Sequence, residues 1–368
     1  MAGALSQRVR PGRVEGWIAA GGVLVGSALL IAFLATHDRS APSTTFPVPQ
    51  AVPVTAGALQ RVGGGRATGW ILPDAYAGPR DVAVQPSGTV WVTEQNKGVV
   101  AVLSQGKAVS YKVDAKFPNS GTFALAAGPG GSMWFTGYPN GNIGRILPDG
   151  TVNSFASAVD ASGTVAATQA DDGSMWITDV NLGVVFRIDG VGHTSVFSVP
   201  APNGTNQRVA PYDIATGTNG RLWFTDPRTR SIGRIGVGGT EPSIVEIPTQ
   251  DQADPRSIAV GRDGQVWVSF SRERGIGRLD QSTGVARMMP VQGAQSPINN
   301  LAVAPDGSLW VTTAGREILH VRPNGGLIER IELPGDATGA DGIAIAPDGT
   351  VWAAATDANM VVEIRPRA

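Results

Sequence analysis

The chain has 368 residues, of which 49 are glycine and 26 are proline, and only 6% are aromatic. So many turn-forming residues favour an all-β protein made of many short strands. The net charge is −1 and the only basic cluster is at the extreme N-terminus, so nothing indicates nucleic-acid binding. The absence of cysteine excludes disulfides, thiolate zinc sites and cysteine nucleophiles.

Residues 17–35 contain no charged side chain over 19 positions. A helix of this length reaches roughly 28 Å, close to the thickness of the hydrocarbon core of a bilayer. Arg8, Arg10 and Arg13 precede the segment, and only Arg39 follows it closely. The positive-inside rule therefore predicts a cytoplasmic tail over residues 1–16, one transmembrane helix over 17–35, and an extracytoplasmic remainder anchored in the plasma membrane. A cleaved signal peptide is the alternative, but the apolar run is longer than the core of such a peptide.

Residues 36–65 are rich in proline, serine, threonine and glycine and show no hydrophobic periodicity. This composition predicts a linker between the membrane and a folded domain. The domain is expected over residues 66–368.

An internal repeat fills that domain. Seven tryptophans stand 42–47 residues apart, each with glycine three positions before it and, in six copies, Thr or Ser two positions after it; they are Trp91, Trp134, Trp176, Trp223, Trp267, Trp310 and Trp352. Each copy predicts a short apolar strand, a glycine turn, the Trp strand, a third strand such as Ile232–Ile235, and a fourth strand. Four short strands in about 40–50 residues are typical of a propeller blade.

The two ends of the domain complement each other. The third strand of the last copy falls at Val361–Ile364, and the chain ends four residues later. A segment that resembles a fourth strand, Trp70–Pro73, stands before the first copy. The sequence therefore predicts a seven-bladed β-propeller of four-stranded blades whose last blade is closed by the N-terminal strand, which leaves no open sheet edge.

The repeat also predicts which residues are structural. We expect the seven tryptophans to pack between blades. The arginines that recur in the third strands are expected to be structural pairs or surface residues, and these are Arg145, Arg187, Arg234 and Arg278.

The repeated motif P-x-x-I, G-x-x-W-F-T, N-x-I-G-R-I resembles the virginiamycin B lyase (streptogramin lyase) family and, more loosely, NHL and gluconolactonase-type propellers. Its clearest copies are Pro211–Ile214 with Leu222–Thr225 and Ile232–Ile235, and Pro255–Ile258 with Val266–Ser269 and Ile276–Leu279. The resemblance covers residues 70–366. It implies a propeller and, for an enzyme, Mg²⁺-dependent opening of a cyclic depsipeptide by elimination.

The family uses histidines in P-H-x-I positions of the last two blades and a glutamate shortly after the last Trp. By motif these positions correspond to Asn299, Asp341 and about Ala355 in this chain. Elimination needs a base with a pKa near neutrality. Asn299 cannot be that base, and Asp341 needs a raised pKa to serve. His37, His193 and His320 are not expected to be catalytic.

Residues just before each first strand are unusually polar and are expected at the mouth of the central channel. The candidate ligand-binding residues are Arg80, Asp81, Tyr212, Asp213, Arg256 and Asn300, with Asn299 and Asp341 as weak catalytic candidates. Glu94, Asp179 and Asp226, three positions after Trp, add to them. Asp81, Asp213 and Asp341 are candidates for a Mg²⁺ or Ca²⁺ site, because oxygen ligands suit both cations. The alternative is that these carboxylates pair with arginines or face water.

Three functions remain open, one of which is a structural scaffold at the cell surface; the other two involve a ligand or a substrate. The first is an anchored module that binds a small molecule, a peptide or an envelope protein. The second is a divalent-metal-dependent lyase or lactone hydrolase that acts at the channel.

Overall fold

The computed structural model describes residues 46–47, 53–104, 106–113, 121–139, 141–155, 162–202, 206–236, 243–249 and 253–365. The predicted tail over 1–16 and the predicted transmembrane helix over 17–35 lie outside these residues. Within the described ranges, no helix has the length and apolar character needed to cross a bilayer. Two short 3-10 turns lie there, η1 (Pro129–Gly131) and η3 (Thr218–Gly220).

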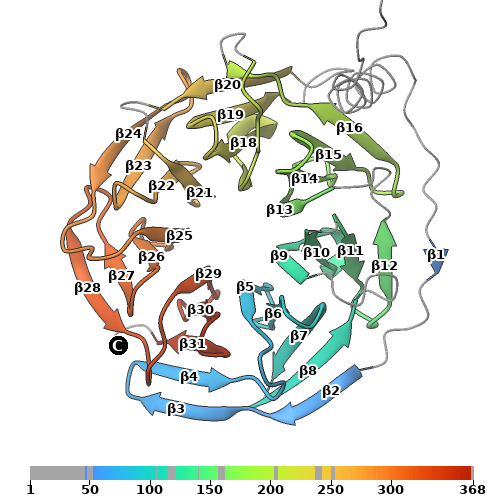
Figure 1. Ribbon diagram of the computed structural model, residues 1–368, viewed down its shortest axis with the longest axis vertical. Helices are drawn as coiled ribbons and strands as arrows, with labels where there is room; N and C mark the ends of the chain where they lie inside the picture. The colour runs from blue at the N-terminus through green and yellow to red at the C-terminus, as the bar shows by residue number, and fades with distance from the viewer. Residues whose placement is uncertain are drawn as a thin grey trace, which may run out of the picture. The chain divides into compact units, whose positions relative to one another are not determined.

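Seven antiparallel sheets surround a central channel, as the repeat predicts (Figure 1). Blades 1 to 3 are β5 (Pro79–Val84), β6 (Val90–Glu94), β7 (Val99–Ser104) and β8 (Lys107–Lys112); β9 (Gly121–Ala127), β10 (Met133–Tyr138), β11 (Ile143–Ile146) and β12 (Val152–Phe155); and β13 (Thr164–Gln169), β14 (Met175–Asp179), β15 (Val184–Ile188) and β16 (Thr194–Ser198). Blades 4 and 5 are β17 (Ile214–Thr216), β18 (Arg221–Asp226), β19 (Ser231–Gly236) and β20 (Ser243–Pro248), then β21 (Pro255–Val260), β22 (Val266–Phe270), β23 (Gly275–Asp280) and β24 (Val285–Pro290). Blade 6 is β25 (Ile298–Val303), β26 (Leu309–Thr313), β27 (Glu317–Val321) and β28 (Leu327–Glu332), and blade 7 begins with β29 (Ala340–Ile345), β30 (Val351–Ala355) and β31 (Met360–Ile364).

The N-terminal strand β4 (Ala67–Ile71) completes blade 7, which confirms the predicted closure. It pairs antiparallel with β31, with Val361 opposite Trp70 and Val362 opposite Gly69. At Gly69 a Cβ would lie 2.6 Å from the sulfur of Met360, so a larger residue where the two ends of the domain meet would require the Met360 side chain to move. The ring is therefore closed by backbone hydrogen bonds between residues almost 300 positions apart.

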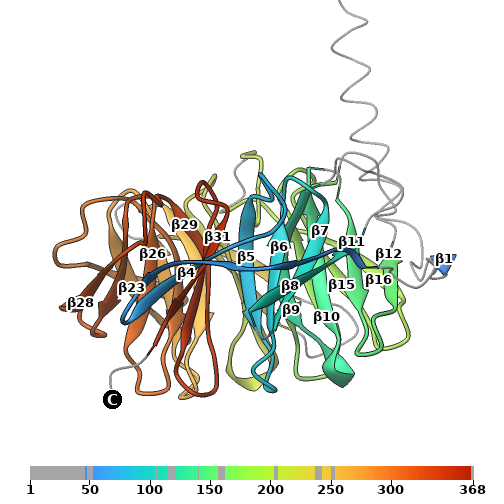
Figure 2. The same ribbon diagram turned by 90° about the horizontal axis from the view of Figure 1, so that it is seen from below.

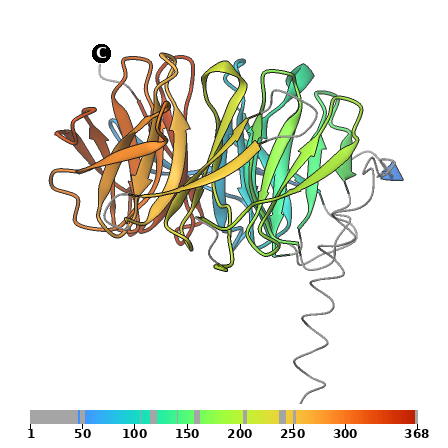
Figure 3. The same ribbon diagram turned by 90° about the horizontal axis from the view of Figure 1, so that it is seen from above.

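The linker predicted over residues 36–65 is wrong for its later part. Strand β3 (Gln60–Gly64) pairs with β4, β2 (Pro53–Ala58) pairs with β8, and β1 (Phe46–Pro47) pairs with β12, so blades 7, 1 and 2 have a fifth strand. Figure 2 shows β2 to β4 crossing the outer side of the ring, and Figure 3 shows the opposite side, where the outer strands of blades 4 to 6 carry no such cover. Pairing with a sheet edge needs only backbone donors and acceptors, so a segment without apolar periodicity can still form these strands.

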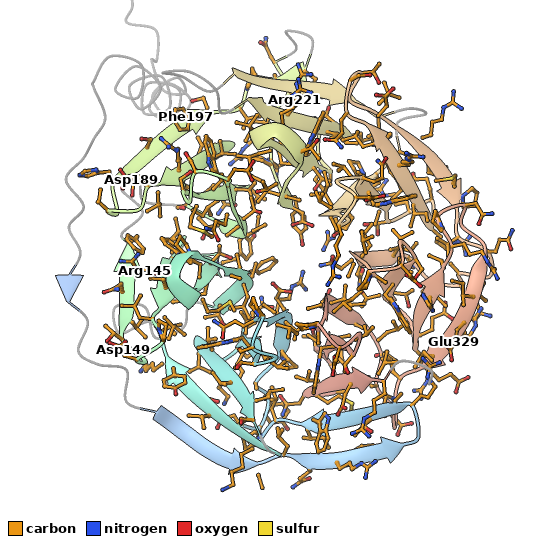
Figure 4. The ribbon with its side chains drawn as sticks, turned by 180° about the vertical axis from the view of Figure 1, so that it is seen from behind. Arg145, Asp149, Asp189, Phe197, Arg221 and Glu329 are labelled. Atoms are coloured by element: carbon orange, nitrogen blue, oxygen red, sulfur yellow. The ribbon has the colours of Figure 1, made fainter. Side chains whose placement is uncertain are left out.

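Six of the seven repeat tryptophans are buried at 8% exposure or less, as predicted. The seventh, Trp352, is half-buried and lines a hollow of about 410 Å³ between blades 7 and 1 together with Trp70. The residue opposite a repeat tryptophan on the third strand is arginine in blades 2 to 5 but Glu363 opposite Trp352. Arg145 stacks over the Trp134 ring at 5.7 Å, and Figure 4 places it on the outer part of its blade, so these arginines belong to the packing between strands, as expected.

In four blades the hydroxyl that follows the repeat tryptophan donates a hydrogen bond to a carbonyl of the next blade. Thr225 Oγ1 accepts a hydrogen bond from the Asp213 amide of its own blade (3.2 Å) and donates one to the Arg256 carbonyl of the next blade (2.9 Å). Thr312 makes the same two bonds, from Asn300 N (3.1 Å) and to Asp341 O (2.7 Å). Both hydroxyls are fully buried, so each bond satisfies a backbone group that water cannot reach.

Blade 7 departs from this pattern because Ala354 stands in the hydroxyl position. Thr356, two residues later, replaces it. Its Oγ1 lies 2.7 Å from the Pro79 carbonyl of blade 1 and 2.9 Å from a carboxylate oxygen of Asp341. The contact between the last and first blades thus uses a different hydroxyl, from a turn rather than from the strand.

Removing one inter-blade hydroxyl should weaken the whole ring. We predict that Thr225→Val lowers the free energy of unfolding by about 1–3 kcal/mol, because it leaves a buried N–H and a buried carbonyl without partners. Denaturant unfolding followed by tryptophan fluorescence would measure the loss. Thr283→Val, at an exposed position, is the matched control and should change stability little. Equal stability of the two variants would contradict a clasping role for Thr225.

Candidate functional site at the channel mouth

Two consecutive residues of every blade line the central channel. One of the two residues stands eleven positions before the repeat tryptophan of its blade. These residues form what we call the mouth ring: Arg80, Phe123, Val165, Tyr212, Arg256, Asn299 and Asp341. The residues ten positions before the tryptophan form the inner ring, which consists of Asp81, Ala124, Ala166, Asp213, Ser257, Asn300 and Gly342. Together these fourteen residues enclose a cavity of about 70 Å³, which has room for a few water molecules.

A β-bulge explains how neighbouring residues can face the same channel. The register of the first strand shifts at this point in six blades, for example between Pro79 and Val82 in blade 1. Without a shift, successive side chains of a strand point to opposite faces. In blade 4 the regular strand begins only at Ile214, after both channel residues.

The inner-ring aspartates hold adjacent blades together. Asp81 accepts hydrogen bonds from the amides of Val82 in its own blade (2.9 Å) and Leu125 in the next (2.8 Å). Asp213 repeats the arrangement with the amides of Ile214 and Ile258, both at 2.9 Å. In each carboxylate, one oxygen accepts the amide of its own blade and the other oxygen accepts the amide of the next blade, so both oxygens are hydrogen-bonded to the backbone.

Burial nevertheless disfavours the charge on these groups. Loss of hydration raises the pKa of Asp81 to about 7, against the lowering effect of its two amide donors, and the nearby carboxylate of Asp213 raises it further. Burial also raises the pKa of Asp213. Two acids that each disfavour the other's ionisation face one small cavity.

The mouth ring carries a network that crosses the channel. Arg80 of blade 1 forms an ion pair with Asp341 of blade 7 at 2.9 Å and donates a hydrogen bond to the Tyr212 hydroxyl of blade 4 at 3.3 Å. Its guanidinium also lies over the Phe123 ring, 4.6 Å from the centroid. Asp341 receives a second contact from Thr356, so its carboxylate is held on two sides.

A larger hollow of about 340 Å³ opens above the mouth ring. It shares five mouth-ring residues with the channel cavity but no inner-ring residue. Its remaining lining comes from the end of β10 and from loops of blades 3 and 4, namely Tyr138, Val180, Ala210, Pro227 and Arg228. Because Arg80 and Tyr212 line both spaces and touch across the channel, their contact forms the floor of this hollow.

The predicted metal site is not formed. Asp81, Asp213 and Asp341 do line one cavity, but among the described residues no three His, Cys, Asp or Glu side chains are grouped so that they could hold a metal ion. The reason is visible in the hydrogen bonds, because two of the carboxylates are occupied by backbone amides and the third by Arg80.

The acids three positions after Trp do not face the channel mouth. Asp179 accepts hydrogen bonds from the amides of Gly163, Asn181 and Leu182, and Asp226 from those of Arg228 and Thr229, so both shape turns. Glu94 is fully buried and accepts a hydrogen bond from Ser110 at 2.8 Å; burial raises the pKa of Glu94 to about 7. None of these three lines the hollow above the mouth ring.

The histidines in the described part of the chain are also away from the channel. His193 is exposed and contacts Asp189 at 3.1 Å, which Figure 4 shows at the outer rim of blade 3. His320 stacks on Trp310 with ring centroids 4.3 Å apart, in the slot that arginine fills in other blades. Neither lines the mouth, and His37 lies outside the described residues.

The sequence reasoning missed Phe123, Val165 and the loop residues because they are apolar or lie outside the first strands. A signal existed for the first two: each stands eleven positions before a repeat tryptophan, as do the polar candidates. Tyr138, Val180 and Pro227 likewise stand four positions after one.

The raised pKa of Asp81 gives a pH dependence of known sign. Its folded-state pKa of about 7 exceeds the usual value for an unfolded aspartate, about 3.9, so the folded protein holds more protons between these two values. This group therefore contributes falling stability as pH rises from about 4 to 7, and no further change above. We predict that Asp81→Asn, which removes the titrating group together with the acceptor of one backbone amide, flattens the melting temperature against pH in that window. A steeper dependence in the variant would show that Asp81 is stabilised by its charge.

Comparison with known proteins shows which family this propeller is similar to. A model of the virginiamycin B lyase family matches residues 66–364. A protein named virginiamycin B lyase from Nocardia farcinica is 30% identical over 166 residues, which are 44% of this chain and 53% of that protein, so the match spans about half of the relative's length.

Solved structures share the fold. A catalytically inactive histidine-to-alanine variant of virginiamycin B lyase from Staphylococcus aureus, with quinupristin, superposes with a TM-score of 0.71 at 24% identity, over 85% of this chain and all of that chain. The protein YCF48 bound to D1 peptide gives a TM-score of 0.61 at 10% identity, over 84% of this chain and 98% of that one. On the extent of the family match, which includes all seven blades and the closing strand, this chain belongs to the virginiamycin B lyase family.

Proposed function

We propose that the protein is a membrane-anchored, extracytoplasmic ligand-binding module whose binding site is the hollow above the mouth ring. The observation that carries this proposal is the hollow itself, which has a volume of about 340 Å³ and is lined by five mouth-ring residues. Its size lies within the range of small-molecule sites, about 300–1,000 Å³, whereas the channel cavity below is too small.

The lining suits a ligand with an apolar or aromatic part. Phe123, Val165 and Val180 come from blades 2 and 3, and Tyr212 and Pro227 come from blade 4. Phe123 and Tyr138 pack at 5.7 Å between ring centroids, so this wall is a joined aromatic surface. A few polar groups within an apolar wall are the usual means of orienting a bound small molecule.

We do not assign the relatives' elimination to this site. Asn299, in one of the positions that the family fills with histidine, has no basic atom and donates its amide to the Ala340 carbonyl at 2.9 Å. Asp341, in the other, is committed to Arg80 and Thr356. Two solved structures of this fold contain a ligand, quinupristin in one and the D1 peptide in the other. The residues of this chain support binding of a ligand but not the elimination reaction.

The anchor rests on the amino-acid sequence. Residues 17–35 form an uncharged run long enough to cross the hydrocarbon core, and the arginines before it favour a cytoplasmic N-terminus. This arrangement leaves the propeller on the outer side, joined to the membrane by the residues that precede β2.

Binding at the hollow is directly testable by filling it. We predict that a ligand-observed NMR screen of uncharged aromatic fragments against the 368-residue chain gives hits that Val165→Trp abolishes, because the added ring occupies the hollow. Thr283→Trp, at an exposed position that lines a different cavity between blades 5 and 6, is the matched control and should keep those hits. Hits that persist in Val165→Trp would place binding elsewhere and contradict the proposal.

The anchor has a separate test. We predict that the full chain stays with the membrane fraction through high-salt and carbonate washes, and that deletion of residues 17–35 releases the propeller. A full-length chain recovered in the wash would show that the segment does not anchor the protein.

A further inference from the structure

We propose that the hollow above the mouth ring recognises an acid: a small molecule or peptide end with a carboxylate next to an aromatic or apolar body. The inference rests on the proposed function and adds the charge of the ligand. It follows from three arginines that line one hollow, of which a single one is neutralised within the ring.

Arg80 is the neutralised arginine. It forms its ion pair with Asp341 and donates to Tyr212, and the side chains of both Arg80 and Asp341 are only about a fifth exposed, at 21% and 18%. Because these contacts fix the guanidinium in the floor of the hollow, Arg80 has little capacity left for a ligand.

Arg256 differs from Arg80 in this respect. Its guanidinium lies over the Tyr212 ring, 4.4 Å from the centroid, and forms no hydrogen bond or ion pair with any residue that the structure describes. A stacked guanidinium keeps its N–H donors in the plane of the group, where they can bind a carboxylate by two parallel hydrogen bonds.

The acids nearest to Arg256 are already engaged. Asp213 receives the amides of Ile214 and Ile258, and Asp254 forms an ion pair with Arg272 at 3.4 Å. Neither lines the upper hollow, so neither carboxylate is placed to occupy Arg256 from the ligand's side.

Arg228 adds a second cationic group on the same side. It is exposed, belongs to the turn after β18, and lines the hollow together with Arg256 and Pro227. The lining of the hollow contains no Asp or Glu. The cationic side chains of the lining other than Arg80 therefore lie on blades 4 and 5, while the wall of blades 2 and 3 is aromatic and apolar. An acid group held by blades 4 and 5, with its body against Phe123 and Val165, satisfies both halves.

Matched probes that differ only in charge test this assignment. We expect 2-naphthoate and N-acetyl-L-phenylalanine to bind the 368-residue chain about tenfold or more tightly than 2-naphthamide and N-acetyl-L-phenylalaninamide, as judged by titration calorimetry at low salt. Arg256→Gln should reduce the affinity for the acids to that for the amides and leave the amides unchanged, which also shows that the hollow is intact. Arg287→Gln, at an exposed arginine away from the mouth, should change neither.

The possible outcomes distinguish recognition of the acid group by Arg256 from binding in the hollow as such. Equal binding of acid and amide to the unaltered chain, or an acid preference that survives in Arg256→Gln, overturns the recognition of an acid by Arg256 but leaves binding in the hollow standing. Binding of no probe, combined with fragment hits that persist in Val165→Trp, overturns both.

Discussion

The pairing of β4 with β31 is the constraint on which the rest of the molecule depends. It makes blade 7 a neighbour of blade 1 and so brings Asp341 within 2.9 Å of Arg80, although 261 positions separate them. The same closure places Thr356 against the Pro79 carbonyl. Both contacts lie at the channel mouth, so the geometry of the candidate site is set by a strand pairing at the outer part of the ring.

The remaining blade contacts repeat one backbone device with changing side chains. In four blades a hydroxyl after the repeat tryptophan bonds to the next blade, and in six blades a bulge in the first strand turns two consecutive residues towards the channel. Because these bonds fix the backbone and not the channel side chains, arginine, phenylalanine, valine, tyrosine, asparagine and aspartate can all occupy the mouth ring without altering the blade. The scaffold and the binding surface are in this sense separable, which is why membership of a family does not by itself assign its chemistry.

Much of this fold was predictable because each local signal repeats six or seven times along the chain. The glycine, tryptophan and hydroxyl positions defined the blades, and the short last copy defined the closure. The strands β2 and β3 were not predictable, since an outer edge strand can form from backbone pairing alone and leaves no apolar pattern. The polar residues of the two rings were found, but the role of Asp81 and Asp213 was not, because no sequence pattern shows that an amide of the next blade lies within 3 Å of a carboxylate.

The contact between Arg80 and Tyr212 crosses the channel. These residues come from blades 1 and 4, and both line the upper hollow as well as the cavity that the inner-ring acids line. Asp341 balances the charge of Arg80, and the Phe123 ring packs against the flat face of its guanidinium. The other two positive charges that line the hollow are Arg256 and Arg228, which lie on one side of the mouth. Had Asp341 been histidine, as the family motif has it, Arg80 would have no carboxylate partner at this place. The Asp341 carboxylate therefore holds Arg80 in the floor on which a ligand would rest.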